Sequence, residues 1–98
     1  MSDLKEKILA KAQECVDILS KKEEKYVQND DPYWTVKQIA IATRKTPLGI
    51  LNILLMKHII TLQTYCNNPS SISPEEVKKA TTDIINYVCL IENYKIGG

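Results

Sequence analysis

The sequence TPLGILNILLMKHIITLQTYC at residues 46–66 predicts a long, strongly apolar helix around which the rest of the chain is arranged. Thr46 is a good cap because its side chain can accept a backbone hydrogen bond, and Pro47 loses no bond at the first helical position. Apolar residues then follow nearly all round the helix over residues 47–66, interrupted chiefly by Lys57-His58. A helix that is apolar on every side is usually buried on several sides. We therefore expect this helix to occupy the middle of the packing, with a dimer as a second way to cover its spare faces.

A first helix is predicted upstream, over about residues 3–26. Its apolar residues recur every three or four positions and form one stripe, made of Leu4, Ile8, Cys15, Ile18 and Leu19. Ser2 or Asp3 can cap its start, and the turn-forming residues 28–32 follow its end. This pattern indicates an amphipathic helix that packs along one face.

Two more helices complete the predicted fold. A short one is expected over about residues 33–44, with Val36, Ile39 and Ala40 inward, although its β-branched residues leave a strand open. The last is expected over residues 74–95, because Ser73-Pro74 repeats the capping logic and one apolar stripe follows. Three long helices and a short one predict an all-α, four-helix bundle-like single domain spanning residues 1–98.

The composition limits the classes of function. The chain has 13 basic and 12 acidic residues, so it lacks the basic excess that proteins binding nucleic-acid backbones usually carry. Cys15, Cys66 and Cys89 have no paired spacing and are expected to be free thiols. The longest apolar stretch, residues 50–56, is short for a membrane span, and no signal peptide is visible. We expect a cytoplasmic protein without a membrane partner.

No strong catalytic signature is present, and whether the chain is an enzyme stays open at this point. Lys57-His58 places a cation and an imidazole inside an apolar helix, where a charge needs a partner. The alternative is that Lys57 reaches solvent while His58 forms hydrogen bonds in the core. Asp83 flanks the stripe of the last helix and is the natural carboxylate to face Lys57.

A second candidate is the pair Glu14 and Asp17. These carboxylates lie three residues apart on one helix face, a spacing that suits a hard cation such as Mg²⁺, and Asp83 could join them from across the bundle. Surface helices carry many such pairs, so an ordinary solvated face is the alternative.

Residues 35–53 can also be interpreted as a helix-turn-helix. A recognition helix needs polar side chains at its start, and here only Asn52 provides one. A DNA-binding protein would also need Arg44 and Lys45 on the same exposed face as Asn52.

Several short motifs suggest a family. They are Lys25-Tyr26 before Asp31-Pro32, Ile39-Ala40, Thr46-Pro47, Leu54-Leu55-Met56-Lys57 and Asp83-Ile84-Ile85-Asn86-Tyr87. Over residues 8–95 the chain resembles small phage-type nucleotide-modification-associated domains, which are distant relatives of the all-α, MazG-like nucleotide pyrophosphohydrolases.

The resemblance implies a nucleotide site near Lys57 and Asp83, the candidate catalytic residues, with Lys57, His58 and Tyr87 as candidate ligand-binding residues. It also implies two carboxylate pairs that hold Mg²⁺ beside a triphosphate, where the metal polarises phosphoryl oxygens and activates water. Glu14 and Asp17 match the first pair, and Asp83 is the third candidate metal ligand.

The second pair is incomplete, because residue 80 is alanine and Glu76 lies at the wrong height along the helix to replace its carboxylate. This departure weighs against hydrolysis and favours nucleotide binding without turnover, or a purely structural descendant.

Three functions therefore compete: a nucleotide-directed protein, a small viral-type protein-interaction module without an active site, and a helix-turn-helix DNA-binding regulator. The first requires Glu14, Asp17, Lys57 and Asp83 to converge on one cleft. The second requires an exposed apolar patch instead.

Overall fold

The computed structural model of the protein describes residues 2–26 and 31–96, without the side chains of residues 2, 23, 25 and 26. Within these ranges the chain forms four α-helices and one short 3-10 helix, η1 (Pro69–Ser71). The α-helices are α1 (Ser2–Tyr26), α2 (Trp34–Thr43), α3 (Pro47–Asn67) and α4 (Pro74–Asn93). The predicted all-α, bundle-like fold is confirmed, and the alternative of a strand over residues 33–44 is wrong. Residues 28–30 of the predicted break lie outside the described residues. α1 already includes Ser2 and Asp3, so the two predicted caps lie in its first turn.

The two proline-led helices begin where the sequence predicts. Thr46 Oγ1 accepts a hydrogen bond of 3.0 Å from the backbone N–H of Gly49, and Ser73 Oγ accepts one of 3.2 Å from Glu76. A β-carbon at position 49 would lie 3.1 Å from Thr46 Oγ1, so glycine gives the cap room. These caps fix the start of α3 and α4 locally, before any tertiary contact is made.

The end of α2 is closed by an unusual residue. Arg44 adopts a left-handed conformation with φ of 56°, and the N–H of Lys45 donates a 2.9 Å hydrogen bond to the Ala40 carbonyl. Such a left-handed residue stops a helix and satisfies its last carbonyl groups, a role usually filled by glycine. The tight turn that results sets α2 across the start of α3.

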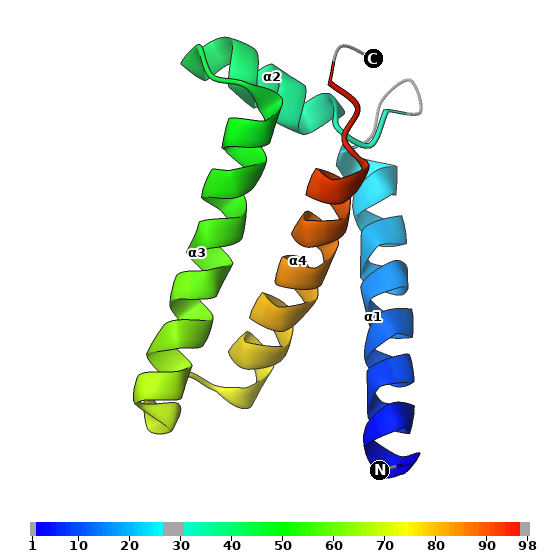
Figure 1. Ribbon diagram of the computed structural model, residues 1–98, viewed down its shortest axis with the longest axis vertical. Coiled ribbons are helices and arrows are strands. Elements are labelled where there is room, and N and C mark those ends of the chain that lie inside the picture. Colours follow the sequence, from blue (N-terminus) through cyan, green and yellow to red (C-terminus); the bar gives the residue numbers. More distant parts are fainter. Residues whose placement is uncertain (1, 27–30, 97–98) are drawn as a thin grey trace.

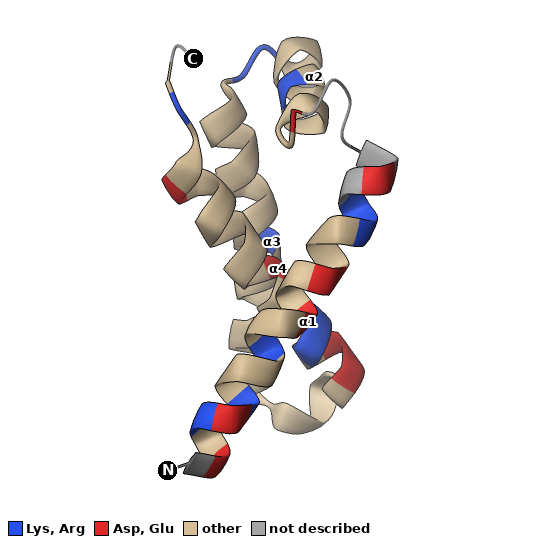
Figure 2. Cartoon of the chain, turned by 90° about the vertical axis from the view of Figure 1, so that its right-hand side faces the viewer, with Lys and Arg blue, Asp and Glu red and all other residues tan. Residues whose placement is uncertain are grey.

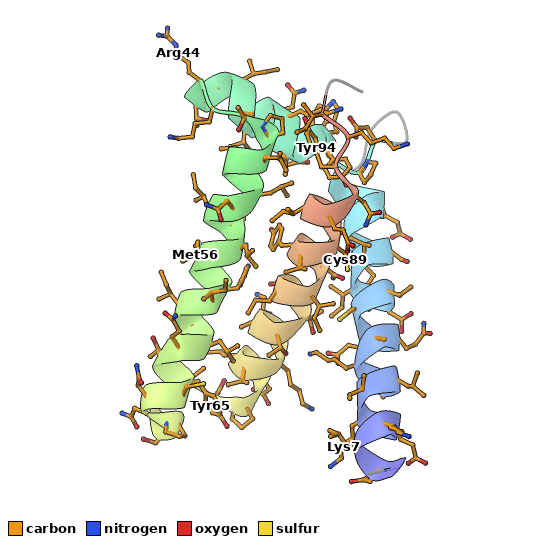
Figure 3. All side chains as sticks on the ribbon, in the orientation of Figure 1. Lys7, Arg44, Met56, Tyr65, Cys89 and Tyr94 are labelled. Carbon is orange, nitrogen blue, oxygen red and sulfur yellow. The ribbon has the colours of Figure 1, made fainter. Side chains whose placement is uncertain are left out.

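Figure 1 shows α4 lying between α3 and α1, while α2 crosses the end of the molecule beside the start of α3. α4 packs against both long helices, so the expectation that α3 forms the middle of the packing is wrong. On α3, Ile53, Met56 and Ile60 are exposed, and Met56 projects from the outer side of the helix in Figure 3. α4 packs along one side of α3 and α2 packs against its start, and these exposed residues lie away from both.

The hydrophobic core lies at the α2 end of this layer. Its buried members are Val36 and Ala40 of α2 and Ile50 and Leu51 of α3, and Leu54, Tyr87, Leu90 and Ile91 are among the residues packed against it. Ile39, predicted inward, is 37% exposed. The core therefore joins the first half of α3 to the second half of α4 under the cover of α2.

Two tyrosines secure the same end. The ring of Tyr33 packs edge-on against Tyr94 at 5.2 Å between centroids, and its hydroxyl donates a 2.8 Å hydrogen bond to the Leu90 carbonyl. Tyr33 thus ties the start of α2 to the end of α4.

The apolar composition of α3 also raises the question of whether this helix could lie in a membrane. By length and composition α3 could cross a membrane, but the core helices of soluble proteins pass the same test. Figure 2 shows charged residues spread along α1, whereas α3 contains a single lysine.

Candidate functional site

The buried carboxylate of Asp83 is the centre of the candidate site. Asp83 is 5% exposed and lies in the middle of α4. Its Oδ1 is 2.9 Å from Lys22 Nζ of α1, and its Oδ2 is 3.5 Å from His58 Nε2 of α3. Because a buried carboxylate is costly without partners, these contacts explain how the fold accommodates it. One aspartate thereby connects all three long helices.

His58 is the second member of the site. Its side chain is 17% exposed and stacks on Tyr87 of α4, with 5.7 Å between ring centroids and 20° between ring planes. Burial lowers the pKa of His58 from its ordinary value of 6.5, and Lys57, Lys22 and Lys79 lower it further, whereas Asp83 raises it. The imidazole is therefore neutral at pH 7, and its 3.5 Å contact with Asp83 is too long for a strong hydrogen bond.

Positive charge dominates the surroundings of His58. The lysines that act on it come from all three long helices: Lys22 from α1, Lys57 from α3 and Lys79 from α4. Among the residues that the structure describes, Asp83 is the one carboxylate that acts on the imidazole in the same way. Three cations around one anion favour an anionic ligand.

A largely apolar pocket of about 340 Å³ adjoins this charged group. It is lined by Leu19, Lys22, Pro32, Thr35, Val36, Ile39, Leu54, Asn86, Tyr87 and Leu90. Asn86 is held in place because its Nδ2 donates a 3.2 Å hydrogen bond to the Cys15 carbonyl of α1. Lys22 and Tyr87 belong both to the pocket wall and to the group around Asp83, so the two form one continuous site.

The structure places the predicted ligand residues in different environments. Tyr87 and His58 contact each other, and His58 contacts Asp83. Lys57 is exposed, and the described ion pairs of Asp83 are with Lys22 and His58. The direct pairing of Lys57 with Asp83 expected from the sequence is therefore wrong. Lys57 is exposed, as the alternative interpretation proposed, and His58 lies beside Asp83 at 3.5 Å, which is long for the hydrogen bond that this interpretation also expected.

Lys22 is the residue that sequence reasoning missed. Its signal was its spacing: it lies four residues after Ile18 and seven after Cys15, on the apolar stripe of α1. A lysine on the buried stripe of a helix needs a carboxylate partner or an exit to solvent, and here the partner is Asp83.

The predicted metal ligands do not converge. Glu14 lies 3.7 Å from Lys11, and Asp17 is exposed and accepts a 2.9 Å hydrogen bond from Gln13. Among the described residues, no three His, Cys, Asp or Glu side chains form a group that could hold a metal ion. Oδ1 of Asp83 lies 2.9 Å from the ammonium group of Lys22, whose positive charge opposes a divalent ion at that oxygen. The arrangement of the described residues does not fit the Mg²⁺ centre that the resemblance implies.

Other sequence candidates lie outside the site. A DNA-binding surface requires exposed polar residues, and Arg44, Lys45 and Asn52 are exposed. However, the next exposed residues along α3 include Ile53 and Met56, where polar base-reading side chains are needed. The three cysteines are free, as predicted, with Cys15 buried and the other two exposed.

Comparison of the chain with protein families, curated proteins and solved structures finds no match. The resemblance to MazG-like domains therefore stays a prediction.

Proposed function

We propose that the protein binds a nucleotide, with its phosphates beside Lys22, Lys57 and Lys79 and its base in the pocket next to Tyr87. One observation carries the proposal: Lys22 lines the apolar pocket and also contacts the buried carboxylate of Asp83. A ligand in the pocket therefore has an ammonium group at one end and apolar walls along the rest.

The pocket favours a ligand with two chemically different ends. Its volume of about 340 Å³ lies at the lower end of small-molecule sites, which suits a single ring system. Its walls are mostly aliphatic and include residues of all four α-helices. A flat, weakly polar base fits such walls, while phosphate groups fit the lysines outside the pocket.

The proposal is binding without turnover and without a divalent ion. The carboxylates that would hold a metal in a MazG-like hydrolase are dispersed here, and Glu14 and Asp17 have other partners. Lysine side chains supply the positive charge that Mg²⁺ supplies in those enzymes.

Thermal denaturation tests the proposal. The protein is heated alone and with each of the four ribonucleoside triphosphates, once with Mg²⁺ and once with a chelator. A ligand that binds only the folded state raises the melting temperature, by several degrees when its concentration is far above its dissociation constant. We expect a shift of this size with at least one nucleotide in both metal conditions.

Lys22→Met and Lys21→Met form a matched pair of variants for this experiment. The two lysines are neighbours in α1, but Lys21 is exposed and Lys22 contacts Asp83. Lys22→Met should lose most of the shift and Lys21→Met should keep it. If no nucleotide shifts the unmodified protein, or if both variants keep the full shift, the proposal fails.

A second candidate function rests on a different observation. Ile53, Met56 and Ile60 form an exposed apolar stripe along the outer face of α3, which is the kind of patch that an interaction module requires. The occupant would be a second copy of the chain, since a dimer covers the free face of α3. Sedimentation equilibrium at increasing protein concentration tests this candidate. A dimer should form, and Met56→Glu should weaken it. A protein that stays monomeric at every concentration, and whose mass Met56→Glu does not change, contradicts this function.

A further inference from the structure

The two oxygens of Asp83 have different partners. Oδ1 faces the ammonium group of Lys22 at 2.9 Å, and Oδ2 faces the imidazole of His58 at 3.5 Å. Lys22 carries a full charge, whereas the pKa of His58 is lowered first by burial and then by the surrounding lysines, so its ring is neutral at pH 7. Asp83 therefore depends on Lys22 for its balancing charge.

The ammonium group of Lys22 cannot pair fully with Asp83 and with a ligand phosphate at the same time. It lies in the wall of the pocket, and its side chain is 41% exposed, so an incoming phosphate can reach it. A phosphate that draws Lys22 away would leave the carboxylate of Asp83, whose side chain is 7% exposed, without a cation. An unpaired buried charge is strongly unfavourable, and a second cation beside it restores the balance.

We propose that ligand phosphate replaces Asp83 as the partner of Lys22, and that His58 then takes up one proton from solvent and becomes the cation beside Asp83. The inference rests on the proposed function, because it needs an anion at the lysines. Nucleotide binding is then coupled to the uptake of one proton by the imidazole of His58.

The charges facing His58 determine the direction of the coupling. They are Asp83 and Lys79 from α4, Lys57 from its own helix and Lys22 from α1. In the free protein the three lysines oppose a proton on the imidazole and Asp83 favours it. Bound phosphate neutralises lysine charge and frees Asp83, and both changes favour the protonated ring.

Proton nuclear magnetic resonance measures this directly, because His58 is the single histidine of the chain. The imidazole C–H signals are followed between pH 5 and pH 8 in the free protein, then with each ribonucleoside triphosphate at a concentration that saturates binding throughout. Inorganic pyrophosphate serves as a probe that has the charge but no base.

We expect the titration midpoint of His58 to rise by about one pH unit or more in the bound state. By linkage, a rise of one unit means that the nucleotide binds about tenfold more tightly at low pH than at high pH. Lys22→Met should raise the midpoint in the free protein, since it removes the same cation, and Lys21→Met should leave it unchanged.

A midpoint that stays constant or falls in the saturated protein overturns the inference. If the melting-temperature shift with nucleotide persists in that case, the proposed function stands and only the proton coupling is wrong. If no nucleotide binds at all, the proposed function falls and this inference falls with it. A raised midpoint with pyrophosphate alone supports the phosphate–lysine exchange and shows that it needs no base.

Discussion

The α2 end of the α3–α4 pair and the first half of α1 both contain apolar residues at three- and four-residue steps, but these residues differ in burial. Leu51 of α3 is 0% exposed and Ile50 is 4% exposed, whereas Leu4 and Ile8 of α1 are 49% and 59% exposed. All four residues lie on helices that are apolar at three- and four-residue steps. An apolar stripe marks the face of a helix that can be buried, but burial requires another element that lies at the same level along the helix. Among the described residues, no such element covers the start of α1.

The contacts that attach α1 to α4 differ in kind from those that join α3 to α4. α1 reaches α4 through one buried apolar residue, Cys15, and through polar links from both sides of it. Lys11 donates to Thr82 Oγ1 at 2.6 Å, and Lys22 contacts Asp83 at 2.9 Å. The α3–α4 pair therefore depends on hydrophobic burial, while the attachment of α1 relies more on polar contacts, from Lys11, Lys22 and Asn86.

Truncating the core should give the largest effect. Leu51→Ala removes a fully buried side chain and leaves a cavity, so we expect a loss of about 3 kcal/mol in the free energy of unfolding, measured with chemical denaturant. The core assignment would be contradicted by a loss below about 0.5 kcal/mol, the range of ordinary surface substitutions.

Removing the carboxylate at the α1 attachment should have an intermediate effect. Asp83→Asn keeps the shape of the side chain but takes away the anion that Lys22 contacts, so we expect a loss of about 2 kcal/mol. Asp17→Asn is the matched control, because Asp17 is an exposed carboxylate of α1, and it should change stability little. Equal effects of the two substitutions would show that Asp83 has no special part in holding α1.

The protonation of His58 should make the free energy of unfolding depend on pH, with a smaller effect than the two substitutions above. Because the pKa of His58 lies below its ordinary value of 6.5, the unfolded chain binds a proton more readily than the folded protein. This contribution to stability is fully present above pH 6.5 and is lost as the pH falls from 6.5 toward the lower folded value. The stability difference between the unmodified protein and His58→Gln, followed between pH 7.5 and pH 5, should therefore shrink; a constant difference would mean that His58 titrates identically in both states.

The smallest effect should come from the open part of α1. Ile8→Ala is the counterpart of Leu51→Ala at an equivalent stripe position, yet its side chain is already 59% exposed. We expect a change below about 0.5 kcal/mol in the free energy of unfolding. A loss near that of Leu51→Ala would mean that Ile8 is covered in solution, which would favour assembly of the protein through α1.

The local signals in the sequence were reliable where the chemistry is local. Thr46-Pro47 and Ser73-Pro74 located the starts of α3 and α4, because a side-chain cap and a proline act within one helical turn. The alternation of caps and turns also gave the number and order of the helices. The left-handed Arg44 was not predicted, since arginine carries no preference for that conformation.

The site was only partly accessible to sequence reasoning. Asp83, His58 and Tyr87 were singled out and do come together, because each interrupts or flanks an apolar stripe. Lys57 was paired with Asp83 in place of Lys22, because nothing in the sequence gives the rotation of α3 about its axis or the side of α4 on which α1 lies. The adjacent residues Lys57 and His58 differ by about 100° around the helix, so that rotation decides which of them faces the carboxylate.

The sequence by itself determined that the chain is helical, where α3 and α4 begin, and which faces can be buried, because capping and periodicity act over a few neighbouring residues. The tertiary structure decided that α4 rather than α3 is the middle helix, that the core lies at the α2 end, and that Lys22 and His58 share Asp83. These features depend on how helices distant in the sequence meet, and an apolar stripe specifies a face for contact without specifying its partner.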